Sequence, residues 1–116
     1  MKHLKKYEYN QYIDDAPNAG DYVLLKVDVK FHNKAEEITK FINNTIGQIY
    51  SVQLRDDEEI DGTVSVMYKN IPKDILTYFY KQNKVYWRNF SMRRIVEFSP
   101  TIDELTIKLN QNKYNL

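Results

Sequence analysis

The side chains best suited to grip a charged or planar ligand lie in residues 81–96, which hold five cations and no acid. Arginine offers a planar fork of donors that matches phosphate or carboxylate, and aromatic rings stack on bases and guanidinium groups. Strand alternation places Trp87 inward and its two neighbours outward. The window therefore predicts a binding patch made by Lys84, Tyr86, Arg88, Arg93 and Arg94. In the alternative, Trp87 and Phe90 fill the core and the cations face water without a ligand.

A second charged cluster lies at residues 56–61, where five of six side chains are acidic. Burying so many carboxylates costs too much free energy, so we expect a solvated hairpin tip that ends at the turn signal Asp61-Gly62. A calcium loop is not predicted, because its ligands alternate around a central glycine. The functional alternative to a plain solvated loop is mimicry of phosphates by Asp56, Asp57, Glu58 and Glu59.

Other catalytic or metal-binding patterns are missing from the sequence. His3 and His32 stand apart, without the spacing of a metal or general-base motif. No serine lies in a nucleophile motif, and the three glycines are isolated, so no phosphate-cradling loop is predicted. We therefore expect no catalytic residue, no metal and no cofactor. The enzyme class stays open only if the fold brings ionisable groups together in a pocket.

Length and composition fit one soluble domain. The chain has 116 residues, a formal net charge of +1 and no cysteine. The small net charge does not demand nucleic acid as a partner, and the lack of cysteine excludes disulfides and is compatible with a reducing cytosol. The basic N-terminus lacks the apolar segment of a signal peptide, and no window is long enough to span a bilayer. We expect a cytoplasmic protein that has no membrane partner.

The longest pattern follows Gly20, where residues 21–31 alternate as a strand with one buried face. Its inward residues are Val23, Leu25, Val27, Val29 and Phe31. Residues 34–43 and 72–81 have helical periodicity, and Thr101 with Glu104 forms a capping box that starts a final helix. Further strands are predicted in residues 46–54, where Ile49 and Tyr50 break the alternation and a bulge is expected near Gly47, and in residues 63–69, 84–90 and 95–98. We expect a flexible, basic, tyrosine-rich arm at 1–19, one domain at 20–110 and a tail at 111–116.

This order of elements resembles an SH3-like small barrel of the KOW and Tudor type. Three short segments carry the likeness: Gly20-Asp21-Tyr22-Val23, Ile46-Gly47-Gln48-Ile49, and residues 91–98. The resemblance implies an α+β fold, a mostly antiparallel five-stranded SH3-like barrel with two inserted short helices and a C-terminal helix.

A second resemblance is to small uncharacterised phage and prophage proteins. It is carried by four segments: the opening Met1-Lys2-His3-Leu4-Lys5, the strand start Gly20-Asp21-Tyr22-Val23, the segment 95–105 and the ending Asn112-Lys113-Tyr114-Asn115-Leu116. It implies a viral protein in the host cytosol. With the missing catalytic motifs, it predicts an accessory protein that binds a host or phage protein and inhibits it by occupancy, for example a host defence system such as CRISPR. The alternative is a nucleic-acid-binding SH3-like module that uses the basic and aromatic patch.

Overall fold

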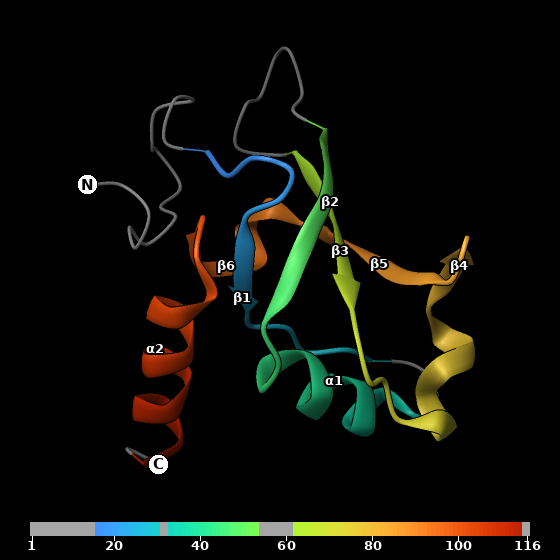
Figure 1. Ribbon diagram of the computed structural model, residues 1–116. Helices are drawn as coiled ribbons and strands as arrows, with labels where there is room; N and C mark the ends of the chain where they lie inside the picture. The colour runs from blue at the N-terminus through green and yellow to red at the C-terminus, as the bar shows by residue number, and fades with distance from the viewer. Residues whose placement is uncertain (1–15, 31–32, 54–61, 115–116) are drawn as a thin grey trace.

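A computed structural model describes residues 16–30, 33–53 and 62–114, which form one antiparallel sheet with two α-helices and two 3₁₀ turns (Figure 1). The strand order is β4-β5-β3-β2-β1-β6. Along the chain the elements are β1 (Tyr22–Leu25), α1 (Ala35–Asn43), β2 (Gly47–Gln53), β3 (Thr63–Tyr68), η3 (Lys73–Tyr78), β4 (Tyr80–Gln82), β5 (Val85–Ser91), η4 (Met92–Arg94), β6 (Ile95–Ser99) and α2 (Ile102–Tyr114).

The predicted α+β class and antiparallel sheet are confirmed, but the described sheet has six strands where five were predicted. The extra strand is β4, which lies inside the helix predicted at 72–81; that helix is a 3₁₀ turn that ends at Tyr78. Asn83 and Lys84 have φ angles of 52° and 68°. Two successive left-handed residues make the tight turn that suits a twisted hairpin, and this turn folds β4 back onto β5.

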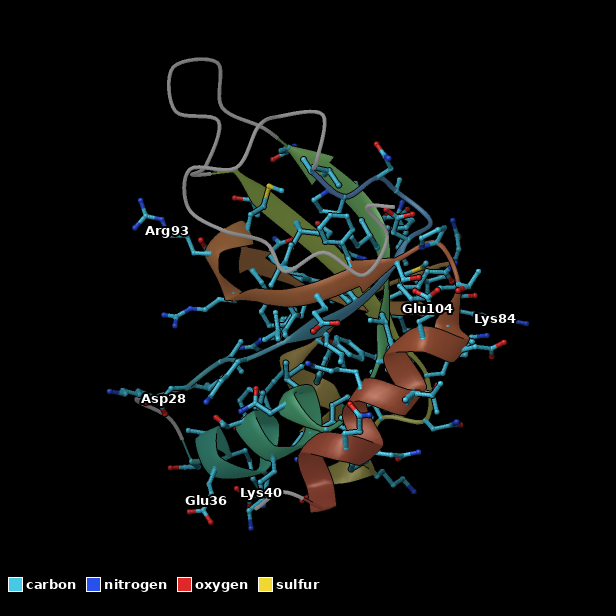
Figure 2. The ribbon with its side chains drawn as sticks, turned by 90° about the vertical axis from the view of Figure 1, so that its left-hand side faces the viewer. Asp28, Glu36, Lys40, Lys84, Arg93 and Glu104 are labelled. Atoms are coloured by element: carbon cyan, nitrogen blue, oxygen red, sulfur yellow. The ribbon has the colours of Figure 1, made fainter. Side chains whose placement is uncertain are left out.

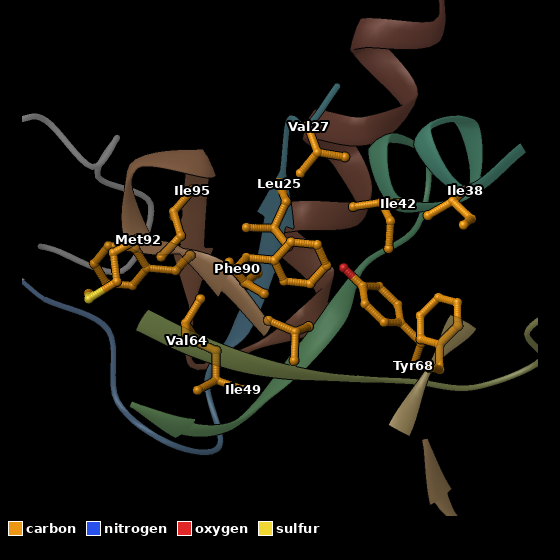
Figure 3. Packing of buried hydrophobic residues seen from close by; sticks show 14 of the residues in the cluster. Leu25, Val27, Ile38, Ile42, Ile49, Val64, Tyr68, Phe90, Met92 and Ile95 are labelled. Carbon is orange, nitrogen blue, oxygen red and sulfur yellow. The ribbon is translucent and has the colours of Figure 1, made fainter. Parts of the chain in front are cut away.

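One face of the sheet builds the core with α1 (Figure 3). Val23, Leu25 and Val27 are buried, as their alternation predicts, and Phe31 lies outside the described residues. From α1, Ile38 and Ile42 are fully buried beside them. The middle strands add Val64 and Val66 from β3, together with Ile49 from β2, Phe90 from β5 and Ile95 from β6. The sheet therefore has a defined inner face, and the opposite side is its outer face.

The outer face of β1 and β6 is covered by α2 (Figure 1). Leu24 is only 3% exposed although alternation predicts a solvated position, because α2 packs there and buries Leu105 completely. Glu97 is buried on the same strand pair, and its carboxylate forms an ion pair with Lys108, with 3.1 Å between Oε1 and Nζ. The predicted final helix thus docks on the sheet, and it closes one half of the outer face.

Candidate binding face and edge pocket

The other half of the outer face, on β2, β3, β5 and β4, carries uncharged side chains. Apart from Tyr50, which lies at the bulge of β2, its members are paired across these strands in register. All are exposed or only partly buried. We call this set the open face: Gln48, Tyr50, Ser51, Gln53, Thr63, Ser65, Met67, Tyr80, Gln82, Val85, Trp87, Asn89 and Ser91.

Three aromatic rings stack across the open face. Tyr80 stands opposite Trp87 in the β4–β5 pair, with ring centroids 4.5 Å apart and planes 26° apart. Tyr50 reaches Trp87 from β2, at 6.2 Å and 27°. The strand register shifts between Ile49 and Ser51, and this bulge places Tyr50 among the outward side chains. Because Trp87 lies between the other two rings, the ring faces left for a ligand are those of Tyr50 and Tyr80, which are 45% and 58% exposed.

The prediction that Trp87 points inward is wrong. In β5 the side chains of Tyr86 and Arg88 lie on the inner face of the sheet, and that of Trp87 lies on the outer face. Its neighbours Tyr86 and Arg88 pair with Tyr68 and Val66, whose side chains are in the core. Tyr86 packs against that core, with Nζ of Lys81 5.6 Å from its ring centroid. The indole Nε1 of Trp87 is buried under the stack and has no acceptor in the described part of the chain.

Arg88 lies half-buried at the edge of the sheet. Its Nη1 donates to the carbonyl oxygen of Tyr78 at 2.7 Å, and its guanidinium carbon is 5.9 Å from the centroid of the Phe79 ring. Burial lowers the pKa of Arg88, since desolvation disfavours the charged form. The contact with Tyr78 ties β5 to the end of η3 and fixes where the guanidinium stands.

A pocket of about 390 Å³ surrounds this guanidinium. We call it the edge pocket, and it is lined by Thr77, Tyr78, Phe79, Tyr80, Arg88 and Asn89. β4 pairs with β5 only as far as Trp87, so the pocket lies where the edge strand ends. Tyr80 belongs both to the pocket and to the open face, which makes the two sites continuous.

The five residues of the predicted basic and aromatic patch do not converge. Lys84 is in the β4–β5 turn, whereas Arg93 and Arg94 are in η4 at the other end of β5. Seven strand residues at about 3.3 Å each separate these ends by roughly 20 Å. Figure 2 shows Lys84 and Arg93 on opposite sides of the molecule. The carboxylates of Asp56, Asp57, Glu58 and Glu59 lie outside the described residues.

Sequence reasoning missed the open face, although its signal was present in part. Tyr50 breaks the alternation of its strand, but Tyr80, the other tyrosine that stacks on Trp87, falls in a stretch with helical periodicity. Within the described ranges, no group of three or more His, Asp or Glu side chains is placed to hold a metal ion. None of the described helices has the length and apolar character required to cross a membrane.

Comparisons with protein-family models, with curated proteins and with solved structures found no match.

Proposed function

We propose that this protein is a non-catalytic binding module that docks on another protein through the open face. The observation that carries the proposal is the absence of charged side chains among the residues that make up the open face, all of them in the described strands, in a chain of which 28% is charged. The centres of protein interfaces are depleted of charged residues and enriched in tyrosine, tryptophan and methionine. The open face combines Tyr50, Tyr80, Trp87 and Met67 with small polar residues that can form hydrogen bonds at its rim.

Charge complementarity favours a protein over a nucleic acid as the partner. Nucleic-acid affinity depends on cations placed against the phosphates, and the open face offers none. The cations of the predicted patch stand at opposite ends of β5 or behind it. The stacked rings suit bases as well as protein side chains, so a single-stranded nucleic acid is the alternative ligand.

We also propose that the sheet is an elaborated SH3-like barrel. Two features support this: β1 pairs with both β2 and β6, and the 3₁₀ turn η4 joins β5 to β6. In this proposal α1 elaborates the first loop, and the β4 hairpin and α2 are additions. Fold alone does not assign an activity, so the binding role rests on the open face and not on the barrel.

The likeness to phage proteins adds a biological setting to this proposal. In it, the protein acts in the host cytosol as an accessory factor that occupies a host protein, a defence component of the CRISPR kind being one such target. Inhibition by occupancy needs a complementary surface and no chemical step, which agrees with a face built of aromatic and small polar groups.

Photo-crosslinking tests which class of partner the open face binds. A benzophenone amino acid replaces Tyr80 in the full chain, and a control protein carries it at Glu36, an exposed position on α1. After irradiation in host cells, we expect the Tyr80 probe to give a discrete protein adduct and the Glu36 probe to give none. An adduct to nucleic acid would transfer the function to the alternative, and equal adducts from both probes would exclude a specific face.

A matched pair of variants then tests the purified complex. Tyr80→Ser removes an aromatic side chain that is 58% exposed on the open face, and Ile107→Ser removes an apolar one that is 60% exposed on α2. We expect Tyr80→Ser to weaken the partner's binding at least tenfold, as aromatic anchors do at interfaces, and Ile107→Ser to leave it unchanged. Equal affinities for the two variants would contradict the proposal.

A further inference from the structure

We propose that the edge pocket binds a single carboxylate group, supplied by an acidic side chain or by the C-terminus of the docking protein. The inference rests on the proposed function for its source of carboxylate, but the pocket's chemistry can be tested without a partner. It assigns to Arg88 a carboxylate ligand that the residues described by the structure do not supply.

The first argument is the state of the Arg88 guanidinium. A guanidinium has five N–H donors, and the described contacts use one of them, on the carbonyl oxygen of Tyr78. No carboxylate of the described residues forms an ion pair with Arg88. A half-buried cation without a counter-ion is costly, and an incoming anion relieves that cost. Two neighbours, the carbonyl of Tyr78 and the ring of Phe79, hold the fork in one orientation, so little order is lost on binding.

The second argument concerns the charge and shape of the ligand. Among the described residues, Arg88 is the one cation that lines the pocket, and the remaining lining is aromatic or neutral. One cation balances a carboxylate, whereas a phosphate monoester carries nearly two negative charges at neutral pH and is normally met by several cations. An arginine fork also matches the planar geometry of a carboxylate by paired hydrogen bonds.

The third argument is the neighbourhood of the pocket. Asn89 lines it, and its Oδ1 accepts from Ser65 Oγ at 2.5 Å, which leaves its amide nitrogen as a donor. Beyond Trp87, β5 has no strand partner on the β4 side within the described residues. Exposed strand edges accept extended peptides. A partner seated on the open face thus meets the pocket directly across Tyr80, and an acidic residue there finds Arg88.

The experiment is a titration of the full ¹⁵N-labelled chain followed by NMR at constant ionic strength. Sodium acetate is the first probe, and sodium chloride replaces it in the control. We expect acetate to shift the Arg88 Nε–H and the Asn89 amide signals in a saturable way. Inorganic phosphate is a second probe, and we expect it to bind more weakly than acetate. Acetate shifts that do not saturate, or tighter binding of phosphate, would overturn the proposal.

Two further probes distinguish the sources of the carboxylate. N-acetyl-glutamate α-methylamide carries only a side-chain carboxylate, and N-acetyl-alanine carries only a chain-terminal one. Tighter binding of the first assigns the pocket to an acidic side chain, and tighter binding of the second assigns it to a C-terminus. If neither compound saturates the same two signals, the pocket is not a carboxylate site.

Variants tie the shifts to the pocket. Arg88→Gln removes the charge and should weaken acetate binding at least about tenfold, the loss expected for even one of the paired charge-assisted hydrogen bonds. Arg94→Gln is the matched control, at an exposed arginine outside the pocket, and should bind acetate as the parent does. Asn89→Asp keeps the acceptor for Ser65 on an exposed residue and places a competing carboxylate beside Arg88, so it tests the site even if Arg88→Gln fails to fold. Parent-like affinity in Asn89→Asp would overturn the proposal.

The two proposals fail in different ways. If acetate binds the parent but not Asn89→Asp, and the Tyr80 probe gives no adduct, the carboxylate site is supported and docking on the open face is rejected. An adduct from Tyr80 without saturable acetate binding would leave the docking face standing and reject the pocket.

Discussion

The two halves of the sheet's outer face are built from the same strands and finished differently. Over β1 and β6, α2 buries Leu24 and Leu105, and Lys108 neutralises the buried Glu97. Over β2, β3, β5 and β4, the described part of the chain provides no such cover, and an uncharged aromatic surface remains. One half is completed by the chain itself, and the other has the composition of a surface that a partner completes.

The difference shows how the open half stays compatible with water. Trp87 is only partly exposed because Tyr50 and Tyr80 lie on its two ring faces. The two tyrosines remain 45% and 58% exposed while they stack on the indole, and an aromatic side chain with a polar tip suits such a position. A self-stacked surface of this kind needs little rearrangement to bind, since its largest anchor is already held in place.

The largest expected effect comes from opening the closed half. Leu105→Ala removes a side chain that is 0% exposed between α2 and the sheet, and should lower the free energy of unfolding by about 2–5 kcal/mol. Urea denaturation measures the loss. The control is Ile107→Ala, on the exposed side of α2, which should change stability by less than about 0.5 kcal/mol. Equal losses in the two variants would mean that α2 does not close this half.

The seam between the halves is the next place to test. Gly47 joins β2 to β1, and a Cβ added there would lie 2.3 Å from Cγ1 of Val66. Gly47→Ala should therefore destabilise the protein by about 1–3 kcal/mol through overpacking. Val66→Ala makes room for the new methyl group, so the double variant should lose less stability than the sum of the two single variants. Additive losses would show that the close approach is relieved elsewhere.

The sequence predicts the closed half better than the open one, and the reason is physical. The alternation from Val23 to Val27 reports burial on one face directly, and a capping box marks the start of α2. The burial of Leu24 could not be predicted, because the helix that covers it lies about 80 residues further along the chain. A local sequence pattern contains no information about such a distant contact.

The open half depends on which face of β5 carries Trp87 and on the turn between β4 and β5. Local sequence patterns leave both features ambiguous. In Val85–Ser91 apolar residues stand at odd and even positions alike, so alternation admits either face for Trp87. Pairing with the strongly alternating β3 decides the phase, and that pairing is a tertiary fact. The pairing of β4 with β5 likewise depends on the left-handed turn at Asn83 and Lys84. The sequence has no glycine there that would predict such a turn.

A smaller effect is expected from loosening the open half. Tyr80→Ser removes one end of the ring stack and should cost about 1 kcal/mol of stability, the usual worth of an aromatic pair. Trp87 is the only tryptophan of the chain, so its fluorescence reports the stack directly. We expect its emission to shift to longer wavelength in Tyr80→Ser and to stay unchanged in Ile107→Ser. An unchanged spectrum in both would show that Tyr80 does not shield the indole.

The smallest expected effect at neutral pH comes from a tyrosine on the inner face of the sheet. Tyr68 is 4% exposed, and its hydroxyl points into the core without a partner among the described residues (Figure 3). Tyr68→Phe removes an unsatisfied buried hydroxyl, so we expect it to stabilise the protein by up to about 1 kcal/mol. Urea denaturation at neutral pH measures this gain.

Tyr68→Phe should also change how the stability of the protein depends on pH in the alkaline range. Burial raises the pKa of Tyr68, so the folded state favours its neutral form. This contribution to stability is fully present below the unfolded pKa of about 10 and is lost as the pH rises above it. Urea denaturation between pH 8 and pH 11 should therefore show a less steep loss of stability with rising pH in Tyr68→Phe than in the parent. Identical slopes in Tyr68→Phe and the parent would mean that the hydroxyl of Tyr68 reaches water, and the inner face would then be no better sealed than the open one.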